Sequence, residues 1–136
     1  MKILRNILAV ISGIIIGSVI NMGIIELGPL IIPNPEDFDN STMETLASTI
    51  HLLGPINYIT VFLAHGLGTL AGAFVVAKIA TTKKKIFALS LSGWFLLGGI
   101  AAVFMFPAPT WYNIIDLVFA YLPMAWLGWK LAGGKK

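Results

Sequence analysis

Five side chains that are costly to bury in lipid lie within or beside long apolar stretches of this sequence: Asn21, Glu26, His65, Asn113 and Asp116. A histidine that faces an aspartate is suited to proton relay or cation coordination, because an imidazole titrates near neutrality and its neighbour tunes it. His65, Asp116 and Glu26 are also residue types that bind divalent metals, but no local motif such as H-E-x-x-H is present. We therefore expect no dedicated metal site and no cofactor.

Four apolar stretches of similar length carry these side chains, namely residues 7–26, 57–80, 86–106 and 112–131. A helix rises about 1.5 Å per residue, so about 20 residues cross the roughly 30 Å hydrocarbon core of a bilayer. Hydrophobic residues make up 57% of the chain and charged residues 11%, against about 25% charged residues in a soluble domain. The sequence predicts an all-α integral membrane protein, a four-transmembrane antiparallel helix bundle that forms one domain over residues 1–136.

The charged residues divide between the two sides of this predicted bundle. Lys and Arg occur before the first stretch, between the second and third, and near the end of the chain, whereas the connection between the first and second carries Glu36, Asp37, Asp39 and Glu44. Cytoplasmic loops are enriched in Lys and Arg, so we expect both termini to be cytoplasmic, in a bacterial-type inner membrane. The net charge of +3 then reflects topology and not nucleic-acid binding, and the partner that it implies is the lipid bilayer.

The outer connection, residues 27–56, is the long one. Its first half is rich in proline, which fixes φ and removes a hydrogen-bond donor, so no helix is expected there. In its second half, apolar residues recur at helical spacing, Ser41 and Glu44 fit a capping box, and Gly54-Pro55 is a stop signal. We expect a short amphipathic helix over about residues 42–53, which covers the bundle or acts as a lid.

The polar residues of the stretches fall in the outer third of the predicted membrane and on semi-polar helix faces. Tyr58, His65 and Thr69 share one face of the second stretch, and Asp116 lies on a similar face of the fourth. The candidate site for a small molecule or an ion comprises Asn21, Glu26, Tyr58, His65, Thr69 and Asp116.

Two alternatives stay open within this set. Asp116 could pair with His65, or hydrogen-bond Asn21 and Tyr58, and thereby only fix the register of the helices. Glu26 lies about 140° around the first helix from Asn21 by ideal geometry. Either Glu26 faces the headgroups, or the Gly28-Pro29 exit turns it toward the site.

Small residues form two stripes at four-residue spacing. Gly13 and Gly17 lie in the first stretch, and Gly68 and Gly72 in the second. Such stripes let helix backbones approach closely in a membrane, so we expect the first two helices to pack tightly against each other, or one of them to meet a copy of itself. Gly98-Gly99 and Pro123 are places where the third and fourth helices could loosen or kink.

These features lead us to expect an oligomeric transporter or channel-like protein with its polar site in the outer leaflet, because four spans rarely enclose a pathway alone. One alternative is a structural or accessory membrane protein whose polar layer serves packing. Another is a membrane-embedded metal-dependent enzyme with the loop helix as a lid, although the sequence favours a role other than catalysis.

Overall fold

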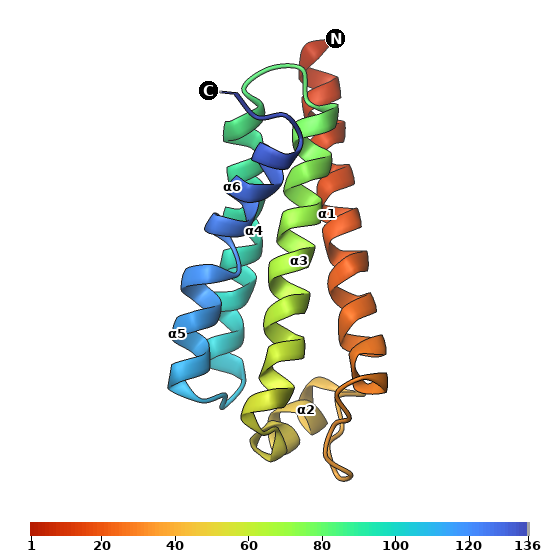
Figure 1. Cartoon of the computed structure of the whole chain (residues 1–136), viewed down its shortest axis with the longest axis vertical. Coiled ribbons are helices and arrows are strands. Elements are labelled where there is room, and N and C mark those ends of the chain that lie inside the picture. The colour runs from red at the N-terminus through yellow and green to blue at the C-terminus, as the bar shows by residue number, and fades with distance from the viewer. Residues whose placement is uncertain (136) are drawn as a thin grey trace.

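The computed structural model describes residues 1–135, and its regular structure over that range is helical. Its elements in chain order are α1 (Lys2–Leu27), η1 (Gly28–Leu30), α2 (Met43–Thr49), η2 (Ile50–Leu52), α3 (Pro55–Ile79), α4 (Lys84–Met105), α5 (Thr110–Phe119) and α6 (Leu122–Leu131). The helices α1, α3 and α4 and the α5–α6 pair run up and down as an antiparallel bundle (Figure 1). Both termini lie at one end of this bundle, the terminal end. The loop with α2 lies at the other, the loop end.

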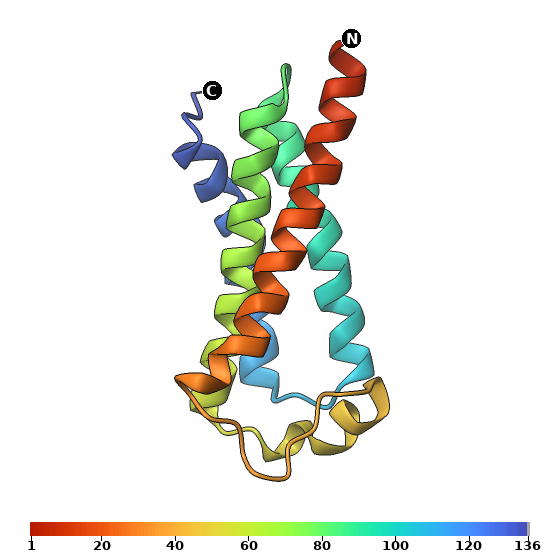
Figure 2. The same ribbon diagram turned by 90° about the vertical axis from the view of Figure 1, so that its right-hand side faces the viewer.

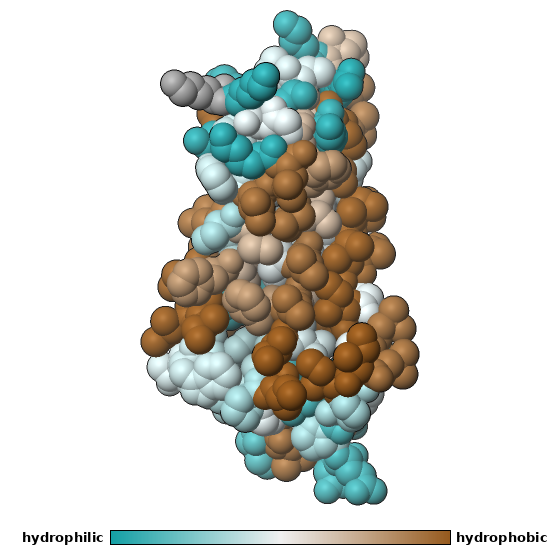
Figure 3. Space-filling model, in the orientation of Figure 1, coloured by the Kyte–Doolittle hydropathy of each residue, from teal (hydrophilic) through white to brown (hydrophobic). Residues whose placement is uncertain are grey.

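Four helical segments are long and apolar enough to cross a membrane, Lys2–Leu30, Pro55–Ile79, Lys84–Met105 and Thr110–Leu131. The surface agrees with this property, because a broad apolar belt separates hydrophilic residues at the terminal end from others at the loop end (Figure 3). The expected helical bundle with four apolar helices is therefore confirmed. The first helix begins at Lys2 and not at residue 7, since a helix can extend beyond the apolar stretch that defines a span.

The fourth segment, predicted over residues 112–131, is two helices that are interrupted next to Pro123, where the sequence indicated a possible kink. It breaks at Ala120 and Tyr121, and Tyr121 has φ −112° and ψ −83°. Pro123 follows in the first turn of α6. Proline lacks an N–H and its ring clashes with the carbonyl four residues earlier, here that of Phe119, so the helix cannot continue unbroken through this point. The Gly98-Gly99 pair, by contrast, lies inside a continuous α4.

The two glycine stripes pack α1 against α3, side by side along the bundle (Figure 2). A methyl group added at Gly13 would lie 2.8 Å from the carbonyl oxygen of Gly72, and one added at Gly17 would lie 2.8 Å from that of Gly68. Any larger side chain would therefore push the two backbones apart. Close approach of this kind replaces the hydrophobic driving force that is absent between helices in lipid.

The terminal half of the bundle has a closely packed core of small and apolar side chains. It comprises Ala9, Ala73, Val76, Ala77, Ala80, Ala88, Leu91, Ala125 and Trp129. A buried amide, Asn6, joins α1 to the α3–α4 turn, because its Oδ1 accepts from Thr81 N at 2.9 Å and its Nδ2 donates to Thr82 Oγ1 at 2.7 Å. Arg5 Nε donates to Ile79 O at 2.9 Å, and a cation at that helix C-terminus is favourable.

The loop helix forms as expected but with different capping. The N-cap is Thr42, whose Oγ1 accepts from Thr45 N at 3.0 Å while Thr45 Oγ1 accepts from Thr42 N at 3.1 Å. The capping box expected from Ser41 and Glu44 is therefore wrong by one residue. Both pairs have the required spacing, but Ser41 N is occupied by a bond to Asp39 Oδ1 at 2.8 Å. The last turn is the 3₁₀ segment η2.

Candidate functional site

The core of the site is a contact between His65 on α3 and Asp116 on α5. His65 Nδ1 lies 2.8 Å from Asp116 Oδ1, and this is the one salt-bridge contact within residues 1–135. The carboxylate is 5% exposed, so it depends on partners inside the protein. A neutral imidazole with its proton on Nδ1 donates to Asp116, whereas an imidazolium forms an ion pair with it. The chain places the pair by aligning a polar face of α3 with one of α5.

Tyr121 completes the network from the break between α5 and α6. Its hydroxyl donates to Asp116 Oδ2 at 3.2 Å, and its ring stacks on the His65 ring with centroids 5.9 Å apart. The break is what re-aims this residue, since the backbone of Tyr121 leaves the helical region. Gly99 on α4 makes room for the ring, because a methyl group there would lie 2.6 Å from the tyrosine hydroxyl.

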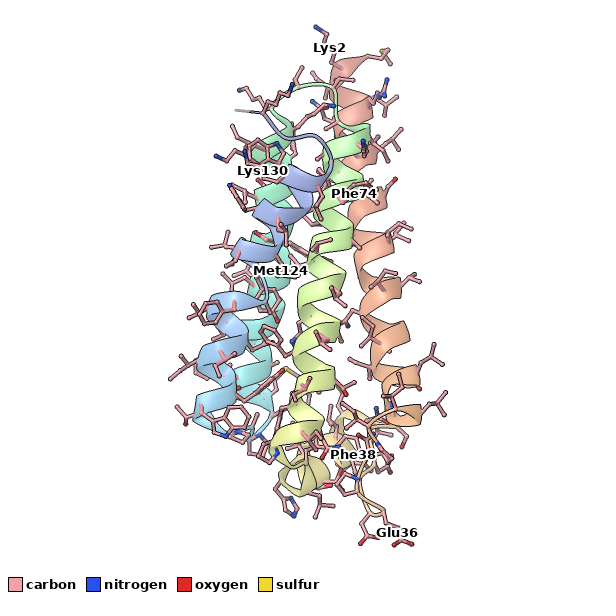
Figure 4. All side chains as sticks on the ribbon, in the orientation of Figure 1. Lys2, Glu36, Phe38, Phe74, Met124 and Lys130 are labelled. Atoms are coloured by element: carbon pink, nitrogen blue, oxygen red, sulfur yellow. The ribbon has the colours of Figure 1, made fainter. Side chains whose placement is uncertain are left out.

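A cavity of about 200 Å³ lies between this network and the loop, at the loop end of the bundle. Its walls come from α3, α4 and α5, and α2, η2 and the proline-rich segment also line it. His65 and Asp116 are part of the wall. In Figure 4, Phe38 lies toward the helices and Glu36 points away from them at the tip of the loop. The loop thus supplies an apolar cover with an acidic outer surface.

The wall of this loop-end cavity is rich in aromatic side chains. Phe38, Tyr58, Phe106 and Tyr112 line it. The Tyr58 and Tyr112 rings lie 4.5 Å apart between centroids, and Trp111 meets Tyr58 edge to face at 5.8 Å. The Tyr58 hydroxyl donates to Ile50 O at 3.4 Å and is not bonded to Asp116. Tyr58 therefore anchors η2 and does not belong to the network of His65, Asp116 and Tyr121.

Tyr112 differs from Tyr58 because its hydroxyl has no partner. The residue is 6% exposed, and within residues 1–135 its Oη makes no hydrogen bond. Tyr112 and Asp116 are four residues apart on α5 and therefore share a helix face. A buried polar atom without a partner is costly, so this hydroxyl indicates a place for a ligand or water in the cavity.

A second cavity, of about 240 Å³, lies on the side of the network toward the terminal end and reaches the side of the bundle. Its lining includes His65, Asn21 and Tyr121, together with Ser18 and Gly98, which are exposed on the surface. Asn21 Oδ1 is buried there, and within the part of the chain that the structure describes it has no hydrogen-bond partner. His65 lines both cavities, and the network thus lies between a loop-end cavity and a lateral cavity.

The remaining candidates lie outside the acidic network. Thr69 lines the lateral cavity, but its hydroxyl donates to His65 O at 2.8 Å within α3. Glu26 is exposed and lines neither cavity, in agreement with the alternative in which it faces outward. Over residues 1–135, no three His, Asp or Glu side chains gather as metal ligands would. Among the described residues, the pair of His65 and Asp116 therefore has no third residue of these types beside it.

Sequence reasoning missed three residues of the site. Tyr121 was not singled out because its role depends on the helix break. Tyr112 lies four residues before Asp116, on the same helix face by its spacing, but was not included in the candidate site. Asn57 pins the loop over the cavity, since its Oδ1 accepts from Gly54 N at 2.9 Å and its Nδ2 donates to Pro33 O at 3.0 Å. Its position three residues after Gly54 was the available signal, because side chains there often cap a helix start.

The two ends of the molecule differ in charge. The loop end carries Glu26, Glu36, Asp37, Asp39 and Glu44 and has neither Lys nor Arg over residues 27–77. Hydrogen bonds from the side chain and backbone of Ser41 hold the pKa of the exposed Asp39 carboxyl below its usual range, so it stays ionised. The end of the molecule that contains the loop-end cavity is therefore negatively charged, which attracts cations.

The arrangement offers a carboxylate with a titratable partner, an unbonded tyrosine hydroxyl and an aromatic enclosure. These groups can bind a small ligand and exchange a proton with it. No protein-family model, curated protein or solved structure matches the chain.

Proposed function

We propose that this protein is an integral membrane transporter that takes a small molecule or an ion into the loop-end cavity and works as a homo-oligomer. The observation that carries this proposal is the His65–Asp116 pair in the wall of that cavity. An ionisable pair among membrane helices is costly, and such pairs mark substrate paths and proton relays in membrane proteins. His65 lines both the loop-end cavity and the lateral cavity, which supports a role for the pair between them.

The proposed orientation has both termini and all lysines in the cytoplasm, with the acidic loop outside, in a bacterial-type inner membrane. It follows from the enrichment of Lys and Arg in cytoplasmic loops. In this orientation the pair and the loop-end cavity lie toward the outer leaflet. Substrate would then enter from outside, at the loop end of the bundle.

The packing of the terminal half favours a transporter over a permanently open pore. Ala73, Val76 and Leu91 there are buried in a core of small side chains, and Gly13 and Gly72 bring the backbones of α1 and α3 together. Passage to the cytoplasm therefore needs a rearrangement of helices or a route between copies of the chain, which is why we propose an oligomer.

Uptake into proteoliposomes tests the proposal. The panel of probes consists of Na⁺, K⁺, methylammonium, acetate and glycerol, and empty liposomes are the baseline. We expect at least one probe to enter faster than the baseline and Asp116→Asn to reduce that rate by about tenfold or more, given the worth of hydrogen bonds to a charged group. The matched control is Glu36→Gln, which removes the same charge from the exposed loop tip and should leave the rate unchanged.

A structural or accessory role is the second candidate, and it has its own supporting observation. His65, Asp116 and Tyr121 join α3 to the α5–α6 pair, so the network also stabilises the bundle. If no probe exceeds the baseline and Asp116→Asn lowers only the melting temperature, the transporter proposal is wrong and the accessory role gains.

A further inference from the structure

The loop-end cavity has a chemistry that selects its ligand. We propose that it binds a small protonated amine, whose ammonium group donates hydrogen bonds to Asp116 and Tyr112 while its apolar part lies among the aromatic side chains. This inference rests on the proposed function in one respect, because it takes the cavity to be the substrate site.

The acidic anchor has room for a ligand. A carboxylate has about four lone-pair positions, and within the described chain Asp116 uses one oxygen for His65 and the other for Tyr121. Positions therefore remain for an N–H donor that reaches it from the cavity. The anchor is also rigid, since Asp116 is 5% exposed and held from two sides.

A second, independent polar group points to the same ligand. Tyr112 is buried and is one of the residues that line the cavity, and its hydroxyl makes no hydrogen bond within residues 1–135. A tyrosine oxygen accepts from an N–H donor. An ammonium group between Asp116 and Tyr112 would satisfy both, whereas a carboxylate ligand would be repelled by Asp116.

The enclosure favours positive charge as well. Tyr58, Tyr112, Phe38 and Phe106 line the cavity, and a cation is attracted to the face of an aromatic ring within about 6 Å of its centroid. Neither Lys nor Arg occurs among the lining residues. The acidic residues of the surrounding loop draw cations toward the mouth.

The size of the cavity sets the size of the amine. A protein cavity of about 150 Å³ accepts benzene, so a cavity of about 200 Å³ suits a molecule with one ring and a short arm. Benzylammonium has this size and charge. Benzyl alcohol and benzoate have nearly the same shape with neutral and negative charge, and the three compounds therefore isolate the effect of charge.

Calorimetric titration of the wild-type protein in lipid nanodiscs gives the first test, with empty nanodiscs subtracted for partitioning into lipid. We expect benzylammonium to bind about tenfold or more tightly than benzyl alcohol, because a hydrogen bond to a charged group contributes this much, and benzoate not to bind. Benzyl alcohol binding as tightly as benzylammonium, benzoate binding most tightly, or none of the three binding would each overturn the amine proposal.

Variants give the second test. We expect Asp116→Asn to weaken benzylammonium binding by about tenfold or more and Tyr112→Phe by about threefold to tenfold, with benzyl alcohol affected less by the first change. Glu36→Gln is the control for charge and should change binding little. Equal losses in Asp116→Asn and Glu36→Gln would show a general field effect and overturn the site.

Tyr112→Phe keeps the proposal testable if Asp116→Asn does not fold. Failure of the amine proposal is also separable from failure of the proposed function. Uptake of acetate or glycerol with no benzylammonium binding would retain a transporter and reject the amine. Benzylammonium binding without uptake of benzylammonium itself or of any other probe would do the reverse.

Discussion

His65 and Asp116 depend on each other because the surrounding helices offer them few other polar partners. Asp116 has His65 and Tyr121, and His65 has Asp116. A buried charge that loses its partner costs far more than a well-made pair gains. The consequences of substitution should therefore differ between the two residues, since a neutral imidazole tolerates isolation better than a carboxylate does.

We predict that His65→Ala destabilises the protein by about 3 kcal/mol, because it leaves a buried carboxylate with one partner. Asp116→Asn should cost about 1 kcal/mol, since the amide leaves no buried charge and still fills the space. Reversible unfolding in mixed micelles measures both. The double variant should cost less than the sum of the two, and additive costs would contradict a direct interaction.

Asp39 provides a prediction about pH outside the helices. Its pKa lies below the usual 3.8 because Ser41 donates to its ionised form. A lowered folded-state pKa means that the ionised carboxylate stabilises the turn above pH 3.8 and that this contribution is lost as the pH falls through the lowered value. Titration of the carboxyl carbon by NMR should show a midpoint below 3.8.

The matched variant for this turn is Ser41→Ala, which removes the hydroxyl and retains the backbone N–H. We expect the Asp39 midpoint to move up toward 3.8 without reaching it. A midpoint that does not move in Ser41→Ala would mean that the side chain contributes nothing and that the backbone bond alone holds the pKa down.

At the scale of elements, the glycine stripes of α1 and α3 determine how closely these helices approach. A methyl group added at Gly68 would lie 2.8 Å from Gly17 O. We predict that Gly68→Ala destabilises by about 1–3 kcal/mol, the usual cost of overpacking, measured by unfolding. Gly93→Ala is the control, because nothing lies within 4 Å of the added group, and alanine is the better helix former by up to about 1 kcal/mol.

The break between α5 and α6 also acts at the scale of elements, because it determines where Tyr121 points. Pro123→Ala restores the missing N–H and should allow the fourth segment to straighten, which would turn the Tyr121 hydroxyl away from Asp116. We predict that Tyr121→Phe costs about 1 kcal/mol in the natural chain and nothing in the Pro123→Ala background. The same cost in both backgrounds would show that the proline does not hold Tyr121 in place.

Much of the element structure could be predicted from the sequence because it depends on local signals. Apolar length defined the helices, and Gly54-Pro55 defined the end of the loop helix. The position of the break at Tyr121 could not be fixed, since Pro123 permits a kink without specifying which residue leaves the helix. The choice of Thr42 over Ser41 as the N-cap depended on a competing bond from Ser41 N to Asp39.

The site was predictable only where it follows helical faces. His65 and Asp116 lie on the faces that the spacing indicated, and the structure brings them to 2.8 Å. The cavity beside them could not be predicted, because part of its wall is loop residues such as Asn34 and Phe38 that have no periodic pattern. That the hydroxyl of Tyr112 has no partner among the described residues could not be predicted either, because it depends on how the walls of the cavity assemble.

At the scale of the whole molecule, charge separates the two ends of the bundle. The described Lys and Arg residues lie toward the terminal end. There, the Nζ atoms of Lys85 and Lys130 lie over the Trp129 ring, 5.0 and 5.1 Å from its centroid. The described acidic residues, apart from Asp116, lie at the loop end. Basic ends with aromatic neighbours are typical of the cytoplasmic interface of membrane proteins.

The orientation that follows can be tested cleanly because the chain contains no cysteine. Glu36→Cys places a thiol at the exposed loop tip, and Lys135→Cys places one near the exposed C-terminal end. We predict that a membrane-impermeant maleimide added to intact cells labels the first and not the second, and that detergent lysis exposes both. Labelling of Lys135→Cys alone in intact cells would mean that the protein has the opposite orientation in the membrane. The loop-end cavity would then open to the cytoplasm, and an amine that binds beside Asp116 would have to be drawn from inside the cell.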